Sequence, residues 1–233
     1  MRSIGRGGRT AAWRRALPAA VVGWLLLVTG CAATQPVQPV APSSGSAAAS
    51  AGADGSASPS SPPPDLVGRR ESLGIAPCPV PTAGGAAVAS TAGADQLPSL
   101  LQTCLDGSGS VDLSALRGTP MVINLWATWC GPCRTEAPFL AEASQQSGGS
   151  VRFIGVDVAD PDPAAALEFA AGQGWTYAQV ADPDRAFAGR IGVVGIPQTL
   201  FVDADGRIVY RHAGALTSAD QLRGLLRDHL AIG

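Results

Sequence analysis

The segment VINLWATWCGPC, residues 122–133, places two cysteines three positions apart between an apolar run and a helix-forming stretch. The apolar run, 121–127, shows no polar alternation, which predicts a central strand covered on both faces. A Cys-x-x-Cys pair at such a junction is a redox motif. Unpaired N–H groups and the helix dipole favour a thiolate at Cys130, so we expect its pKa to lie below the usual value of about 8.5. Cys133, one turn later, is placed to attack any mixed disulfide that Cys130 forms.

Further apolar runs and helical stretches surround the motif. We expect strands at 111–113, 151–158, 176–180, 198–203 and 207–213, and helices at 133–146, 163–173, 183–191 and after Ser218, with Gln221 as its capping-box partner. Asp205-Gly206 is a strong hairpin signal, and Pro138 is expected to kink the first helix. The pattern predicts an α/β fold with a mixed sheet and helices on both faces.

The N-terminal 30 residues differ in composition from the rest of the chain. Residues 1–15 carry five arginines and no acidic residue, residues 16–28 are largely apolar, and small residues precede Cys31. This pattern is typical of a lipoprotein signal peptide, cleaved before Cys31, whose sulfur would carry the lipid. The alternative is an ordinary signal anchor with an incidental cysteine.

The chain after the signal divides into three parts of different composition. Residues 31–65 are mostly Ala, Ser, Gly and Pro and predict a disordered tether. Residues 66–96 form a Pro/Gly-rich approach, and 97–233 form the folded domain. Without residues 1–30, 11 arginines oppose 18 acidic residues, a formal net charge of −7, and there is no lysine. This balance argues against nucleic acid as a partner and against electrostatic adhesion to anionic lipid.

Three segments together resemble a known family: VINLWATWCGPC, Pro138 and GIPQTLFVDADGRIV (195–209). They are similar to the thioredoxin superfamily, especially to its extracytoplasmic, membrane-tethered TlpA/ResA-like branch, which includes the CcmG/DsbE reductases of cytochrome c maturation. The resemblance covers residues 97–232. It implies a thioredoxin-like three-layer fold with a central mixed sheet, helices on both faces and the helix–strand insert of that branch at 159–180. It implies no cofactor.

The resemblance also implies roles for the motif residues. Cys130 corresponds to the exposed nucleophile and Cys133 to the resolving thiol. The residues expected to contact the substrate beside them are Trp129, Gly131 and Pro132.

Two further features of the family bear on the site. Pro197 corresponds to the cis-proline that faces the disulfide, and the backbone at Ile196 to the segment that pairs with an extended substrate. Asn124 stands where cytosolic thioredoxins carry a buried aspartate, and it cannot titrate. In the TlpA/ResA-like branch a glutamate three residues after the motif is proposed to exchange protons with the resolving thiol, which points to Glu136. The alternative is a solvated acid on the helix surface.

Cys78 and Cys104 complete an even set of four cysteines after Cys31. A bridge between them would contribute about 3.5 kcal/mol in the chain-entropy model. The alternative is that one of them belongs to a second redox centre. A zinc site is not expected because only one Cys-x-x-Cys pair exists. His212 and His229 are isolated in the sequence.

These observations predict a lipid-anchored thiol:disulfide oxidoreductase on the extracytoplasmic face of the cell membrane. The Gly-Pro dipeptide of the motif favours a reductant of exported protein disulfides, with apocytochrome c suggested by the resemblance and a membrane electron donor of the CcdA/DsbD type. The alternatives are an oxidant of exported proteins and a tethered, non-enzymatic binding module.

Overall fold

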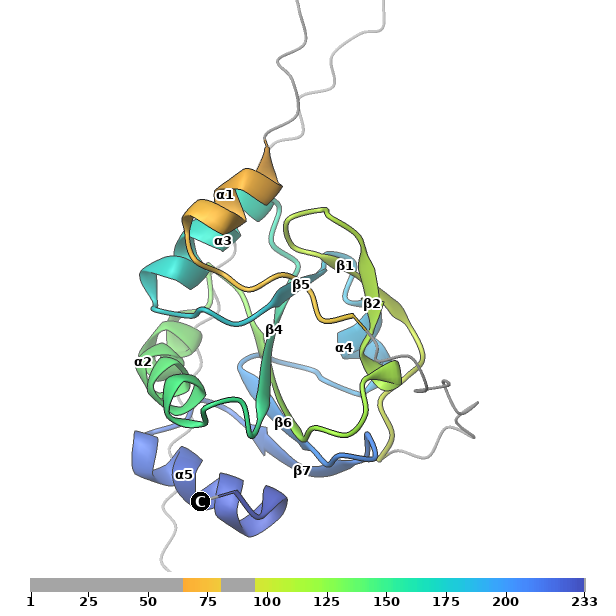
Figure 1. Ribbon diagram of the computed structural model, residues 1–233, viewed down its shortest axis with the longest axis vertical. Coiled ribbons are helices and arrows are strands. Elements are labelled where there is room, and N and C mark those ends of the chain that lie inside the picture. The colour runs from red at the N-terminus through yellow and green to blue at the C-terminus, as the bar shows by residue number, and fades with distance from the viewer. Residues whose placement is uncertain (1–64, 81–94, 233) are drawn as a thin grey trace, which may run out of the picture. The chain divides into compact units, whose positions relative to one another are not determined.

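A seven-stranded mixed sheet forms the centre of the part of the chain that the structure describes, residues 65–80 and 95–232 of a computed structural model (Figure 1). Its strand order is β2-β1-β5-β4-β3-β6-β7. The strands are β1 (Leu101–Cys104), β2 (Ser110–Asp112), β3 (Met121–Trp126), β4 (Arg152–Val158), β5 (Gln179–Asp182), β6 (Gln198–Val202) and β7 (Ile208–Ala213). The three central strands β5, β4 and β3 are parallel, and antiparallel pairs flank them on both sides.

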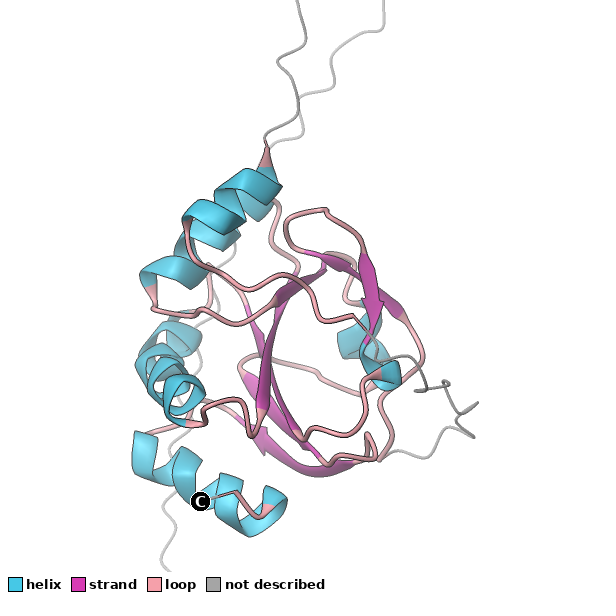
Figure 2. Cartoon of the chain, in the orientation of Figure 1, coloured by secondary structure: helices cyan, strands magenta, loops and turns pink. Residues whose placement is uncertain are grey.

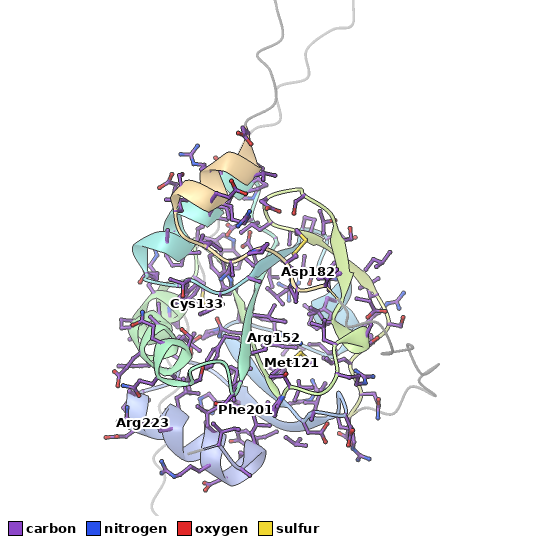
Figure 3. The ribbon with its side chains drawn as sticks, in the orientation of Figure 1. Met121, Cys133, Arg152, Asp182, Phe201 and Arg223 are labelled. Atoms are coloured by element: carbon purple, nitrogen blue, oxygen red, sulfur yellow. A yellow bond between two sulfur atoms is a disulfide. The ribbon has the colours of Figure 1, made fainter. Side chains whose placement is uncertain are left out.

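Helices cover both faces of this sheet, as the sequence predicts (Figure 2). The helices are α1 (Leu66–Ser72), α2 (Gly131–Gln146), α3 (Pro163–Gly172), α4 (Ala186–Arg190) and α5 (Ala219–Leu230). Buried residues of α2, α3 and α5 belong to one core cluster and those of α4 to another. In Figure 3, Phe201 lies on the α5 side of the sheet and Met121 on the opposite side.

Strand β3 is almost continuously apolar in the sequence because both of its faces are buried. Val122 and Trp126 belong to the cluster under α2, whereas Ile123 and Leu125 belong to the cluster on the α4 side. Every residue of the strand is buried, so neither face requires polar residues. Asn124 shares the face of Val122 and Trp126, because side chains alternate along a strand. Asn124 therefore places a polar side chain under α2.

The helix ends follow local sequence signals. Asp162 caps α3, accepting hydrogen bonds from the N–H groups of Ala164 and Ala165 at 2.9 and 3.2 Å. Ser218 caps α5 by accepting from the Gln221 N–H at 3.1 Å. The Gln221 side chain accepts from the Thr217 N–H at 2.7 Å rather than from the cap residue. This differs from a standard capping box, in which the Gln221 side chain would accept from the N–H of Ser218 itself.

Two elements were not predicted, and both depend on tertiary contacts. Strand β1 has only four residues, and its alternating burial is too short to identify from the sequence. Helix α1 has no buried residue, but its Arg70 binds Asp106 at 2.7 Å. Ile75 is 2% exposed and joins the core. The packed region therefore includes residues that the sequence assigns to an approach segment.

Other predicted boundaries shift by a few residues. The strand expected at 111–113 ends at Asp112, where a short 3-10 turn begins, Leu113–Ala115. The strand expected at 176–180 begins at Gln179, and the helix expected at 183–191 covers only Ala186–Arg190. Helix α2 continues through Pro138 to Gln146.

The predicted signal peptide (1–30), Cys31 and the tether, apart from Asp65, lie outside the described residues. Among the helices that the structure describes, none has the length and apolar character needed to cross a membrane.

Gly155 in β4 leaves the space in which two neighbouring side chains meet. Trp126 Nε1 donates to Gln179 Oε1 at 3.0 Å. A Cβ at Gly155 would lie 1.8 Å from that Oε1 and 2.8 Å from Trp126 Nε1. We expect Gly155→Ala to lower the free energy of unfolding in urea by about 3 kcal/mol, the upper range for overpacking. In Gly172→Ala, the control, the new Cβ meets nothing within 4 Å; an equal loss in both variants would contradict this account.

Candidate active site

The two motif cysteines form a disulfide at the beginning of α2, with Cα atoms 5.3 Å apart. Cys130 is the N-cap residue, and its Sγ accepts a hydrogen bond from the Cys133 N–H at 3.2 Å. Figure 3 shows Cys133 on the α2 side of the sheet. The predicted junction of strand and helix is therefore confirmed. The Cys133 N–H and the positive end of the helix dipole at the Cys130 sulfur stabilise a thiolate in the reduced protein.

The exposure of the motif is uneven. Cys130 is only 4% exposed and Cys133 is fully buried, whereas Trp129 is 57% exposed. The expectation of an exposed Cys130 is wrong for this disulfide form, because the bond ties its sulfur to a cysteine in the core. Gly131 and Pro132 are exposed. A partner would therefore approach the disulfide over these three exposed residues.

The Ile196–Pro197 peptide bond is cis, as the family resemblance implies. Strands β3 and β6 pair antiparallel up to Leu125 and Gln198. Continuing this register places Pro197 opposite Trp126 and Ile196 opposite Ala127. Both residues thus lie at the strand end from which the motif loop begins.

Glu136 is fully buried beneath α2, which rules out the solvated alternative. Its two carboxyl oxygens accept hydrogen bonds from Asn124 Nδ2 and from the Leu216 N–H, each at 2.8 Å. Burial raises the pKa of Glu136 to about 7, although both hydrogen bonds act in the opposite direction. Cys133 lies one turn earlier on α2 and is also fully buried. A carboxyl group that can exchange a proton near neutral pH therefore lies on the same buried helix face as the second cysteine.

Sequence reasoning missed a polar row on the sheet below Glu136. Asn124 Nδ2 also donates to Thr199 Oγ1 at 3.1 Å. Thr199 pairs directly with His212 of β7, so the two side chains share a face. His212 Nε2 is buried without a hydrogen-bond partner among the described residues. In the sequence this histidine is isolated, and only the strand register shows that it lies near the buried carboxyl group.

A second group of polar contacts holds the loop before the motif. Asp160 accepts hydrogen bonds from the Thr128 N–H and hydroxyl, both at 2.7 Å. The Arg134 guanidinium donates to the Thr128 carbonyl through Nη2 at 2.6 Å and Nε at 3.1 Å. All three hydrogen-bonding groups of Thr128, two residues before Cys130, are therefore engaged. No sequence signal pointed to Asp160 or Arg134.

Cys78 and Cys104 also form a disulfide, with Cα atoms 5.9 Å apart. It joins the segment after α1 to the end of β1, which agrees with the cysteine parity. In the described part of the chain, no group of three or more His, Cys, Asp or Glu side chains is arranged to hold a metal ion.

Comparisons with known proteins agree with this site. A model of the redoxin family matches residues 83–226. The chain is 36% identical over 135 residues to a thiol:disulfide interchange protein DsbE homolog of Paracoccus denitrificans, covering 57% of this chain and 73% of that protein. It is 38% identical over 101 residues to DsbE of Escherichia coli, covering 43% of this chain and 52% of that protein, about half its length.

The fold has a similar counterpart among solved structures. A secreted disulfide oxidoreductase of Mycobacterium tuberculosis, described as homologous to E. coli DsbE, superposes with a TM-score of 0.50 at 27% identity, covering 56% of this chain and 96% of that one. These similarities to enzymes do not support a non-enzymatic binding module. The chain therefore belongs to the redoxin family and has the thioredoxin-like fold of the DsbE and ResA thiol-disulfide oxidoreductases.

Proposed function

We propose that this protein reduces disulfides of exported polypeptides, with Cys130 as the nucleophile and Cys133 as the resolving cysteine. The observation that carries this proposal is the position of Cys130. Its sulfur caps α2, bonded to the Cys133 N–H and linked to the Cys133 sulfur. The first cysteine is thus stabilised as an anion, and the second lies within bonding distance of it.

The reaction needs two exchanges of sulfur partners. The Cys130 thiolate attacks one sulfur of the substrate disulfide, forms a mixed disulfide, and releases the other substrate sulfur as a thiolate that takes a proton from water. Cys133 then loses its proton and attacks the Cys130 sulfur, which releases the second substrate thiolate for protonation. Two electrons pass to the substrate, and the Cys130–Cys133 disulfide forms.

Glu136 is the group that we assign to the proton of Cys133. Its pKa of about 7 allows it to accept a proton near neutral pH. Cys133 and Glu136 are both excluded from solvent, so water is not the obvious base for this thiol. Asn124 fixes the carboxyl group through its 2.8 Å hydrogen bond but does not itself titrate.

The cellular setting belongs to the same proposal. The N-terminal pattern supports a lipid anchor at Cys31 and an extracytoplasmic location, and the M. tuberculosis counterpart is described as secreted. The oxidised enzyme then requires electrons from a membrane carrier of the CcdA/DsbD type. Apocytochrome c is the first substrate to test, on family resemblance alone.

A trapping experiment tests the reductive cycle. In Cys133→Ser the mixed disulfide on Cys130 cannot be resolved, so we expect covalent adducts with exported proteins on non-reducing gels, identified by mass spectrometry. The Cys130→Ser/Cys133→Ser double variant should trap none. Adducts that form equally in both variants, or no adducts in the single variant, would remove the proposal.

The equilibrium potential decides the direction of electron flow. With the Gly-Pro dipeptide of thioredoxin, we expect the Cys130–Cys133 pair to equilibrate with glutathione or dithiothreitol near about −270 mV. A value above about −180 mV would identify an oxidant instead.

A further inference from the structure

A cavity of about 260 Å³ lies over the sheet on the side of α1 and α3. Its floor is a row of paired residues on three neighbouring strands: Thr103 of β1, Ala181 of β5 and Asp157 of β4. Thr103 is exposed, Ala181 is half-buried and Asp157 is buried. The floor thus leads from solvent over small side chains to a carboxyl group, across two strand spacings or about 10 Å. We call this cavity the side channel.

The walls of the side channel are mostly apolar, and its inner end is acidic. The walls include Leu66 of α1, Leu105, Pro163 of α3 and Pro183. At the inner end, Asp157 is 3% exposed, and its Oδ1 has no hydrogen-bond partner among the described residues. Asp160 also lines the cavity.

The side chains of Asp157 and Asp160 interact with each other in the side channel. Burial, and secondly the hydrogen bond and charge of Asp160, raise the pKa of Asp157 to about 9. Asp157 therefore keeps its proton near neutral pH. A ligand with an apolar stem and a cationic end would satisfy the walls, the charge and the unpartnered oxygen together.

The side channel is close to the reacting cysteine. Asp160, at its inner end, holds both the N–H and the hydroxyl of Thr128 at 2.7 Å. Thr128 precedes Cys130 by two residues, about 7 Å of extended chain. A polypeptide docked at Cys130 can therefore reach the channel with a side chain only a few residues from its own cysteine.

We propose that the side channel binds a lysine or arginine side chain of the substrate polypeptide, with its stem against the apolar walls and its charged end on Asp157 and Asp160. This inference rests on the proposed function and adds the class of substrate: polypeptides with a basic residue near the reactive cysteine. Charge complementarity extends beyond the channel, because residues 31–233 carry 11 arginines against 18 acidic residues. An acidic side chain would meet like charge there, and a neutral apolar one would leave the carboxyl groups unsatisfied.

Peptide substrates test the proposal with the reduced full-length protein. Each peptide holds one cysteine in a mixed disulfide, with lysine, arginine, norleucine or glutamate placed one to three residues before or after it. We expect kcat/KM for lysine or arginine to exceed that for norleucine by at least about tenfold at one position. Glutamate at that position should be the slowest.

Two variants assign the preference to the channel. Asp157→Asn removes the acid, and Ala181→Leu fills the floor without changing charge; in each, the ratio of lysine to norleucine should fall to near one. Asp228→Asn, the same substitution at an exposed site on α5, should keep the wild-type ratio. Binding can also be measured in the wild-type protein from the NMR chemical shift of the Ala181 methyl group. This signal should shift with the lysine peptide and not with the norleucine peptide.

The outcomes separate this inference from the proposed function. Reduction of all peptides at the same rate, or an equal loss of preference in Asp228→Asn, would overturn the channel and leave the oxidoreductase intact. A norleucine preference would show an apolar pocket and also overturn it. Failure to reduce any peptide would instead remove the proposed function.

Discussion

Cys130→Ser is expected to lower the rate of insulin disulfide reduction at least about 10³-fold, because a serine hydroxyl cannot form the mixed disulfide through which all turnover passes. The helix N-terminus that stabilises a thiolate at this position cannot ionise an alcohol whose proton is far less acidic. The protein should remain folded, since sulfur and oxygen both accept the Cys133 N–H at a helix cap. Turnover is measured with the full-length chain and dithiothreitol as the electron source.

Cys31→Ser is the matched control for this loss. It makes the same substitution at a cysteine outside the Cys130–Cys133 motif, so the insulin reaction should proceed at the wild-type rate. Residual turnover in Cys130→Ser within tenfold of wild type would mean that another cysteine starts the reaction, and Cys78 and Cys104 would then be the candidates.

The second large effect is a pH-dependent crossing of stability between the wild type and Glu136→Gln. The pKa of Glu136 is about 7 in the folded protein, against 4.5 for an unperturbed glutamate. Below pH 4.5 the Glu136 carboxyl group is protonated in both the folded and the unfolded state, so its titration does not lower the stability. Between pH 4.5 and 7 only the unfolded chain ionises, which favours unfolding. The stabilising contribution of Glu136 is therefore lost as the pH rises through 7. The loss amounts to about 3 kcal/mol.

Glutamine is neutral at every pH and does not suffer this loss. Its single amide oxygen can accept from Asn124 or from Leu216 but not from both, which costs about 1–2 kcal/mol throughout. Urea unfolding should therefore find Glu136→Gln less stable than wild type at pH 5 and more stable at pH 8. Its turnover should also lack the rise near pH 7 that the wild type shows when the carboxyl group becomes a base.

Glu142→Gln provides the comparison on the same helix. Glu142 is exposed on α2 and pairs with Arg223 at the surface. Its stability curve should run parallel to that of the wild type from pH 5 to 8. No crossing in Glu136→Gln would contradict a protonated, buried carboxyl group in the folded state. A crossing in Glu142→Gln as well would show that the effect does not come from Glu136.

Local patterns in the sequence were enough to predict the central features of this protein. The apolar run before Cys130 predicted β3, and the helix-forming stretch that begins at the motif predicted α2. Asp205-Gly206 predicted the hairpin of β6 and β7, and the family resemblance of the segment around Pro197 implied its cis bond. Such features depend on residues that are neighbours along the chain, and backbone sterics and helix capping act over the same short range.

The surroundings of the disulfide depend instead on residues far apart in the sequence. Whether Glu136 is buried follows from how α2 rotates onto β3, and its partner Leu216 is 80 residues away. Two features require the register of the parallel strands. One is the pair of hydrogen bonds from Thr128 to Asp160, and the other is the floor of the side channel that ends at Asp157. Spacing along the chain predicts which residues share an element, but it does not specify which elements meet or in which register, because packing of the whole core selects both. The sequence alone therefore determined the reacting sulfurs and their fold, and only the tertiary structure decided the acid–base groups and the cavity beside them.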